Sequence, residues 1–245
     1  MHVEAVQRMY RESLRALLQF TTRIPVGGPA DFDAFARHSY LYPLAGWIIG
    51  GIAALVVLPI RQGILSAAIA LSAVLLLSGF HHLDGLLDFG DAAMVHGDRE
   101  RRIAILTDHA VGAGGFGLGL AVTLVAFGSL AASPSVAVAI LAGEVSAKLA
   151  LSWITVLGTP FREGIHSRLH RQARPVFLFL SLLLFLPIIL LAGWRGAAAA
   201  VLVTVLTLFL FLQASRRLFG GVNGDVAGAA HEVTRAVVMA ALVFI

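Results

Sequence analysis

Long apolar runs separated by short polar connections dominate the chain. Seven such segments stand at about residues 40–60, 63–83, 112–132, 134–157, 175–193, 196–213 and 227–245. Each is close to the ~20 residues that a helix needs to cross a bilayer. The pattern therefore predicts an all-α fold: a polytopic membrane helical bundle of about seven transmembrane helices, in a single domain over residues 1–245.

The stretch before the first apolar segment has a different pattern. From about residue 8, Leu14 and Leu18 lie on one side of a helix, while Arg11 and Arg15 lie around the other. An apolar stripe opposite positive charges is typical of a helix that lies in the membrane interface. We therefore expect an N-terminal amphipathic helix in addition to the spans.

Composition and charge add a topology to this picture. The chain is 58% hydrophobic and 13% charged, against roughly 45–50% apolar residues in ordinary soluble domains. Of the arginines outside the apolar segments, only Arg61 and Arg195 fall on one side, and all others fall on the opposite side. The positive-inside rule then predicts a multi-pass protein of the cell (inner) membrane with a cytoplasmic N-terminus. No basic stripe alternates with aromatic residues, so we expect no nucleic acid as a partner.

Three carboxylates stand where the second apolar segment ends. If the segment continues as a helix, Asp84, Asp88 and Asp91 share one face, because they are four and three residues apart. Beside a low-dielectric region their repulsion is poorly screened, so protons or cations must neutralise it. Oxygen ligands favour Mg²⁺ or a similar hard cation. The alternative is a solvated helix start, and the adjacent His82 is a base, a ligand or a packing residue.

A glycine-rich stretch opens the last apolar segment on the same side of the membrane. Gly221 and Gly224 would let backbone N–H groups approach a ligand, and a helix N-terminus attracts phosphate. Asp225 and Glu232 are seven residues apart and share a helical face. The alternative is that Gly224 and Gly228 form a helix-packing pair.

Further polar residues lie between and within these segments. Arg102 belongs to a charge run that could reach substrate phosphates, and Asp108 stands beside a glycine-rich helix start. The basic loop with Arg162 serves topology or binds an anionic substrate. Glu144 and Lys148, four apart within a span, form either a structural ion pair or a functional one.

Taken together, the motifs resemble one enzyme family. They are His82-Leu83-Asp84-Gly85-Leu86-Leu87-Asp88-x-x-Asp91, Asp108-x-x-x-Gly112 and Gly220-Gly221-x-x-Gly224-Asp225-x-x-Gly228-Ala229-x-x-Glu232. Their order and separation are similar to those of the cobalamin synthase family, the adenosylcobinamide-GDP ribazoletransferases. The resemblance covers nearly the whole chain. It implies a membrane transferase of cobalamin biosynthesis that uses Mg²⁺ to join α-ribazole, or its 5′-phosphate, to adenosylcobinamide-GDP with release of GMP.

The resemblance also implies roles for individual residues. The expected metal ligands, direct or through water, are Asp84, Asp88, Asp91 and Asp225. The residues expected to orient or deprotonate the ribazole nucleophile are His82 and Glu232. The residues expected to contact the substrates are Arg102, Asp108, Arg162, Gly221 and Gly224.

Two other kinds of membrane protein gather acids in this way. CDP-alcohol phosphotransferases and membrane prenyltransferases hold Mg²⁺ with aspartates at helix ends, but their aspartate spacings differ. An ion-coupled transporter would place its acids near the middle of the bilayer or show inverted repeats, whereas here the acids lie at one face. The sequence leaves open a homo-oligomer, the number of metal ions and the form of ribazole used.

Overall fold

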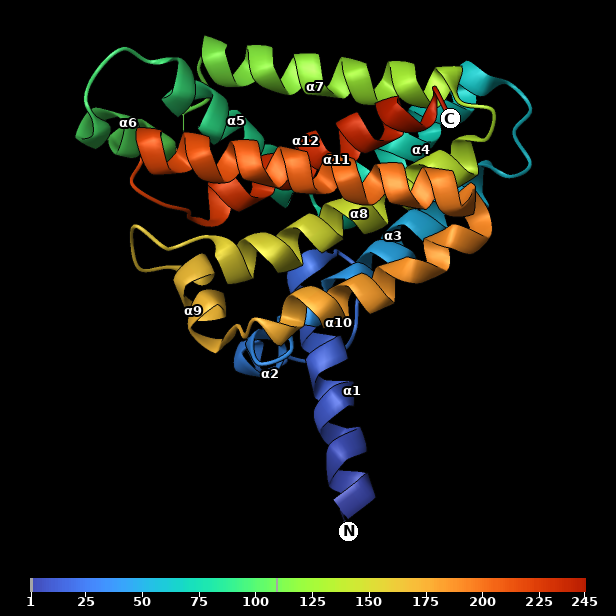
Figure 1. The fold of residues 1–245 in the computed structure, drawn as a ribbon, viewed down its shortest axis with the longest axis horizontal. Coiled ribbons are helices and arrows are strands. Elements are labelled where there is room, and N and C mark those ends of the chain that lie inside the picture. The colour runs from blue at the N-terminus through green and yellow to red at the C-terminus, as the bar shows by residue number, and fades with distance from the viewer. Residues whose placement is uncertain (1, 109) are drawn as a thin grey trace.

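The computed structural model describes residues 2–108 and 110–245 as helices joined by short connections, with no β-strand among these residues (Figure 1). This confirms the expected all-α fold. Two short 3-10 helices, Ser39–Leu41 and Leu186–Ile188, precede α3 and α11. The α-helices are α1 His2–Thr21, α2 Phe32–Ala36, α3 Tyr42–Val57, α4 Gly63–Ser78, α5 His81–Met94, α6 Arg99–Leu106, α7 Ala113–Ala132, α8 Val136–Leu157, α9 Ile165–Gln172, α10 Val176–Phe185, α11 Ile189–Leu218 and α12 Gly224–Leu242.

Several of these helices are long and apolar enough to cross a membrane. By length and composition the described residues contain four such segments, or five when the bent pair α4–α5 counts as one span. The four are Ser39–Val57, Ala113–Ala132, Val136–Leu157 and Val176–Leu218. The last of them has 43 residues, and from the break at Gly193 its two halves run in opposite directions (Figure 1). The expected number of about seven spans stays a prediction.

The second apolar segment does not continue as one straight helix. It ends with α4, and α5 starts after a bend of 92°. Gly79 and Phe80 at the bend both have left-handed backbones, with φ of 65° and 62°, a conformation that is uncommon for residues other than glycine. The backbone N–H of Arg23 donates to the carbonyl of Leu77 at 2.7 Å and so covers the end of α4. The bend turns α5, with its three aspartates, across the end of the bundle.

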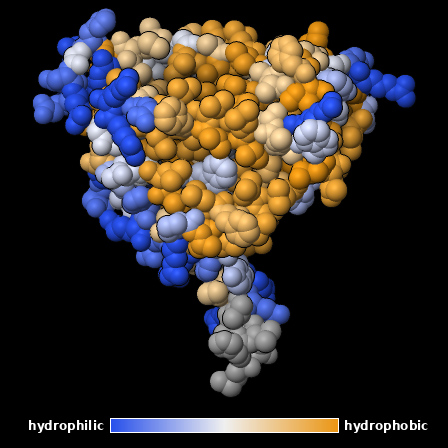
Figure 2. Space-filling model, in the orientation of Figure 1, coloured by the Kyte–Doolittle hydropathy of each residue, from blue (hydrophilic) through white to orange (hydrophobic). Residues whose placement is uncertain are grey.

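The connections of the bundle gather at two opposite ends. α6, α9 and the connections that follow α8 and α11 lie at one end, and the α3–α4 turn, the α7–α8 turn and the C-terminus lie at the other (Figure 1). This separates the arginine-rich connections from the short turns, as the charge pattern predicts. Figure 2 shows an apolar band between hydrophilic ends. Exposed apolar residues on α11 contribute to such a surface, namely Leu202, Leu206, Phe209 and Leu210.

The N-terminal helix is amphipathic, as expected. α1 runs crosswise to the bundle helices and projects away from them at its N-terminal end (Figure 1). Leu17 is buried against the bundle while Arg11 is exposed. The helix ends at Thr21 because Ile24 precedes Pro25, and a residue before proline avoids the helical conformation. Within the bundle, α8 packs against α3 and α12, and α12 also packs against α5.

Candidate active site

The two glycine- and aspartate-containing motifs meet where α5 crosses α12. A Cβ atom on Gly85 would lie 2.8 Å from the carbonyl oxygen and 2.9 Å from the Cα of Asp225. A Cβ on Gly228 would lie 3.2 Å from the Cα of His82. Real Cβ atoms essentially never lie under 3.0 Å from such atoms, so Gly85 requires glycine for the helices to touch, whereas a Cβ on Gly228 would push the His82 backbone away by a few tenths of an ångström. A Cβ on Gly224 would meet nothing within 4 Å. Gly228 therefore packs against α5, whereas Gly224 packs against no other helix, so the two glycines do not form a helix-packing pair.

Beside this crossing lies a polar hollow of about 310 Å³, which we call the acidic cavity. Its carboxylates come from four parts of the chain: α5, the segment after α6, the loop between α8 and α9 with Glu163, and the first turn of α12. Arg162 of the same loop adds positive charge. The site residues expected from the sequence that line it are Asp84, Asp88, Asp108, Arg162, Gly224 and Asp225.

Asp225 lies in the first turn of α12, at the end of the bundle and outside the candidate spans. Burial raises the pKa of its carboxyl, the neighbouring Asp84 raises it further, and Arg162 acts against both. The Asn223 side-chain amide donates to Asp225 at 2.6 Å and fixes its position. A carboxylate held in place near a second one gains from a bound cation. These oxygens fit a hard cation such as Mg²⁺.

Asp91 faces a different neighbour. Its carboxylate accepts hydrogen bonds from the backbone N–H groups of Gly112 at 2.7 Å and Gly115 at 2.8 Å. It thereby caps the N-terminus of α7, where the helix dipole favours negative charge. Although Asp84 and Asp91 share a helical face, seven residues separate them by roughly 10 Å along the axis. Asp91 is absent from the residues that line the acidic cavity.

Two other expected substrate contacts hold the framework of the site. The Arg102 guanidinium donates to the carbonyls of Ala92 and Ala93, both at 2.9 Å, and so binds the C-terminal turn of α5. A Cβ on Gly221 would lie 2.4 Å from the carbonyl oxygen of Thr159. Gly221 therefore lets the connection before α12 pack against the loop that carries Arg162. Neither Arg102 nor Gly221 lines the acidic cavity.

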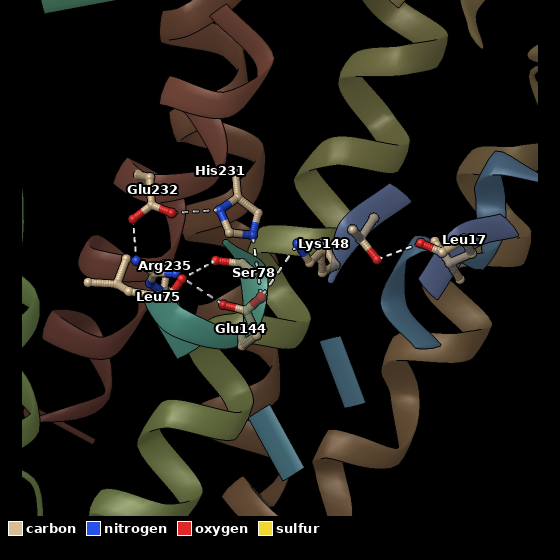
Figure 3. Close-up of polar contacts among 9 residues, drawn as sticks. Leu17, Leu75, Ser78, Glu144, Lys148, His231, Glu232 and Arg235 are labelled. Atoms are coloured by element: carbon tan, nitrogen blue, oxygen red, sulfur yellow. Dashed lines mark hydrogen bonds and ion pairs between the residues drawn. The ribbon is translucent and has the colours of Figure 1, made fainter. Parts of the chain in front are cut away.

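Glu232 belongs to a closed ring of buried charges formed by side chains of α8 and α12 (Figure 3). His231 Nδ1 lies 3.2 Å from Glu232, and its Nε2 lies 3.5 Å from Glu144. Arg235 closes the ring, since it bonds Glu232 through Nη2 and lies 3.2 Å from Glu144 through Nη1. Lys148 stands 3.6 Å from Glu144, as its i,i+4 spacing predicts. All five side chains are buried. Buried charges are stable only when they are paired, and the contacts within the ring provide that pairing.

His82 connects this ring to a second hollow. Its imidazole stacks on that of His231, with ring centroids 4.0 Å apart and planes inclined by 19°. Nitrogen and oxygen atoms of His82, His231 and Glu232 approach within 4.8 Å of one another, close enough to share a metal ion. Because Glu232 already pairs with Arg235, a cation there would meet a guanidinium. The acidic cavity is therefore the better cation site.

The second hollow has a volume of about 430 Å³, and we call it the apolar cavity. Rings and aliphatic side chains form most of its wall, including Phe20, Tyr42, His82, Leu151 and Leu169. It adjoins the acidic cavity. The residues that line both are Ile165, His166, Gly224 and Asp225.

His166 is a residue of this shared wall that the sequence did not single out. Its Nε2 lies 2.8 Å from the carbonyl of Gly158, which fixes Nε2 as the protonated nitrogen and leaves Nδ1 as the acceptor. Burial lowers the pKa of His166 to about 4, so the ring is neutral at physiological pH. Its place directly after Arg162-Glu163-Gly164 is the signal that could have drawn attention to it.

The sequence is similar to those of known proteins that share one name. The model of the Cobalamin-5-phosphate synthase family matches residues 13–243. A protein of Halorubrum lacusprofundi is 38% identical over 245 residues, covering 93% of this chain and 95% of its own. A protein of Pyrobaculum islandicum is 37% identical over 230 residues, covering 93% of each. A protein of Haloquadratum walsbyi is 32% identical over 243 residues, covering 93% and 95%. All three are named adenosylcobinamide-GDP ribazoletransferase. No solved structure matches the chain.

Proposed function

This chain belongs to the cobalamin-5-phosphate synthase family, and we propose that it is the transferase that joins α-ribazole, or its 5′-phosphate, to adenosylcobinamide-GDP with release of GMP. A ribose hydroxyl of the ribazole attacks the pyrophosphate. A new P–O bond forms, the P–O bond to GMP breaks with its electron pair going to GMP, and the hydroxyl proton passes to the released phosphate or to water. The family and the names of its members support the reaction, and the site supports its chemistry.

The observation that carries the proposal is the convergence of carboxylates from α5 and α12 on one cavity that also contains Arg162. Displacement at a pyrophosphate depends on positioning and on neutralised oxygens. A hard cation such as Mg²⁺, held by Asp84, Asp88 and Asp225, would supply that neutralisation. Arg162 would bind a phosphate oxygen, and the N-terminus of α12 at Gly224 would attract another.

We infer that the reaction takes place at one face of the membrane. The acidic cavity lies at the bundle end that carries α9 and the arginine-rich connections (Figure 1). By the positive-inside rule this end faces the cytoplasm. Water-soluble substrates and GMP would then enter and leave on the cytoplasmic side while the corrinoid stays at the membrane surface.

The reaction can be tested with purified protein in lipid nanodiscs. Protein, Mg²⁺, adenosylcobinamide-GDP and α-ribazole are incubated, and GMP and the corrinoid product are measured. Asp84→Asn and Asp225→Asn should each lower the rate by about 100-fold or more, since even partners of metal ligands cost about 10–100-fold. Glu100→Gln, an exposed acid on α6 outside both cavities, is the matched control. No Mg²⁺-dependent product, or undiminished rates in both aspartate variants, would refute the proposal.

A further inference from the structure

The apolar cavity has a composition that the reaction site beside it does not explain. Side chains of α1, α3, α8 and α9 form one part of its wall, and the first turns of α5 and α12 form the rest, without Asp84 or Asp88. Phe20 and Tyr42 contribute aromatic rings, and Leu151 and Leu169 contribute buried aliphatic side chains. Apart from Asp225 at the border, this wall offers pyrophosphate and its counter-cations none of the charged side chains that line the acidic cavity. A flat apolar group would gain from it, because aromatic rings stack on one another.

The size of the cavity limits what it can hold. About 430 Å³ falls near the lower end of the range for small-molecule sites. This volume suits a heterocyclic base with part of its ribose and is too small for a corrin macrocycle with its side chains. Both substrates of the proposed reaction carry aromatic bases: guanine and adenine in adenosylcobinamide-GDP, and a benzimidazole in α-ribazole. Only the benzimidazole has no exocyclic polar groups, which a mostly apolar wall would leave without hydrogen-bond partners.

The shared wall gives such a ligand its direction. Gly224, His166 and Asp225 line both cavities, so a base in the apolar cavity would place its ribose at the border of the acidic one. The Nε2 of His166 is bound to Gly158, which leaves the acceptor Nδ1 to approach a ribose hydroxyl. Backbone N–H groups at the start of α12 are close by.

We propose that the apolar cavity binds the aromatic base of α-ribazole, and that the ribose reaches the pyrophosphate past His166 and Asp225. This inference rests on the proposed function, because that reaction requires a nucleoside-like acceptor. Two neighbours fix the cavity wall in place. Phe20 packs edge-on against Phe32, with centroids 5.1 Å apart, and the ring of His82 stacks on the buried His231.

Direct binding separates this role from turnover. We would measure the Kd of α-ribazole for nanodisc-embedded protein by calorimetry, with Mg²⁺ present and no corrinoid. Phe20→Leu keeps an apolar side chain but removes the ring, and should raise Kd about tenfold, in line with base stacking on an aromatic side chain. Phe20→Tyr keeps the ring and should stay within about twofold of the wild type.

The matched control is Phe116→Leu, a change at an exposed ring on α7 outside both cavities, which should leave Kd unchanged. In turnover assays, Phe20→Leu should raise the KM for α-ribazole and not the KM for adenosylcobinamide-GDP. Circular dichroism and thermal unfolding would establish that each variant is folded.

The outcomes distinguish this inference from the proposed function. Wild-type protein that releases GMP, with a folded Phe20→Leu variant of unchanged Kd and KM for α-ribazole, overturns the inference alone. Loss of co-purified phospholipid in Phe20→Leu, with unchanged α-ribazole binding, also overturns it, because the cavity would then hold an acyl chain. Ring-dependent binding of α-ribazole without any GMP release supports the inference and overturns the proposed function.

Discussion

Replacing Arg235 by methionine should strongly destabilise the protein, because the ring of buried charges would lose the member that joins its two acids. Arg235 contacts both Glu144 and Glu232, and all three side chains are buried. Methionine fills a similar volume without charge. Glu144 would keep Lys148 at 3.6 Å and His231 at 3.5 Å as its nearest cationic or polar groups, neither of which replaces a direct guanidinium contact.

The magnitude follows from the burial. Removing one partner of a buried ion pair costs about 3–5 kcal/mol, because an uncompensated charge remains in a medium of low dielectric constant. An exposed pair costs about 0–1 kcal/mol. Arg171 and Glu163 form such an exposed pair at 2.7 Å, so Arg171→Met is the matched control. The double variant Glu232→Gln/Arg235→Met removes one charge of each sign and should cost clearly less than the sum of the two single variants.

The assay is unfolding in mixed micelles with rising SDS content, followed by circular dichroism. The free energies of unfolding of the wild type, the two single variants, the double variant and Arg171→Met complete the cycle. The reasoning is refuted if Arg235→Met costs no more than Arg171→Met. It is also refuted if the Glu232→Gln and Arg235→Met effects simply add, since the pair would then carry no coupling.

Three further predictions concern the frame of the site. Gly85→Ala should lower GMP release by at least tenfold, since its Cβ would press on the α12 backbone, and an unchanged rate would contradict this. The control is Gly117→Ala, because a Cβ on Gly117 would meet nothing within 4 Å. Asp91→Asn should cost about 1 kcal/mol of stability as a weakened cap and keep most activity, in contrast to Asp84→Asn; equal losses of activity would instead place Asp91 in the chemistry. Because the pKa of His166 is lowered to about 4 from 6.5, the unfolded state takes up a proton first as pH falls below 6.5. Stability should drop by about 1.4 kcal/mol per pH unit down to about pH 4, and His166→Asn should lack this slope in pH-dependent SDS unfolding.

The sequence predicted that the two motifs meet, on the basis of the spacing of their acidic residues and the distribution of arginines. Asp84 and Asp88 are one helical turn apart, and the arginine pattern placed them at the same membrane face as Asp225. Both inferences use only local periodicity and a rule on loops, and the structure brings these residues to one cavity. The Glu144–Lys148 pair was visible for the same local reason.

The remaining features depend on contacts between distant segments. Whether Asp91 turns to a cation or to the start of α7 depends on where Gly112 lies, and no spacing within α5 contains that information. Arg235 joins Glu144 only because α8 packs against α12. The bend at Phe80 follows an apolar run with no proline to announce it. His166 is one histidine in a short polar helix, and its role depends on the loop at Gly158.

The crossing at Gly85 and Gly228 has a consequence for how such sequences can diverge. The two stretches lie far apart along the chain, yet the space at Gly85 leaves no room for a methyl group, and the space at Gly228 is tight. We therefore expect a larger residue at Gly85 to be accepted only together with a shift of α12. The crossing thus couples the sequence of α5 to the sequence of α12, although about 140 residues separate Gly85 from Gly228 along the chain.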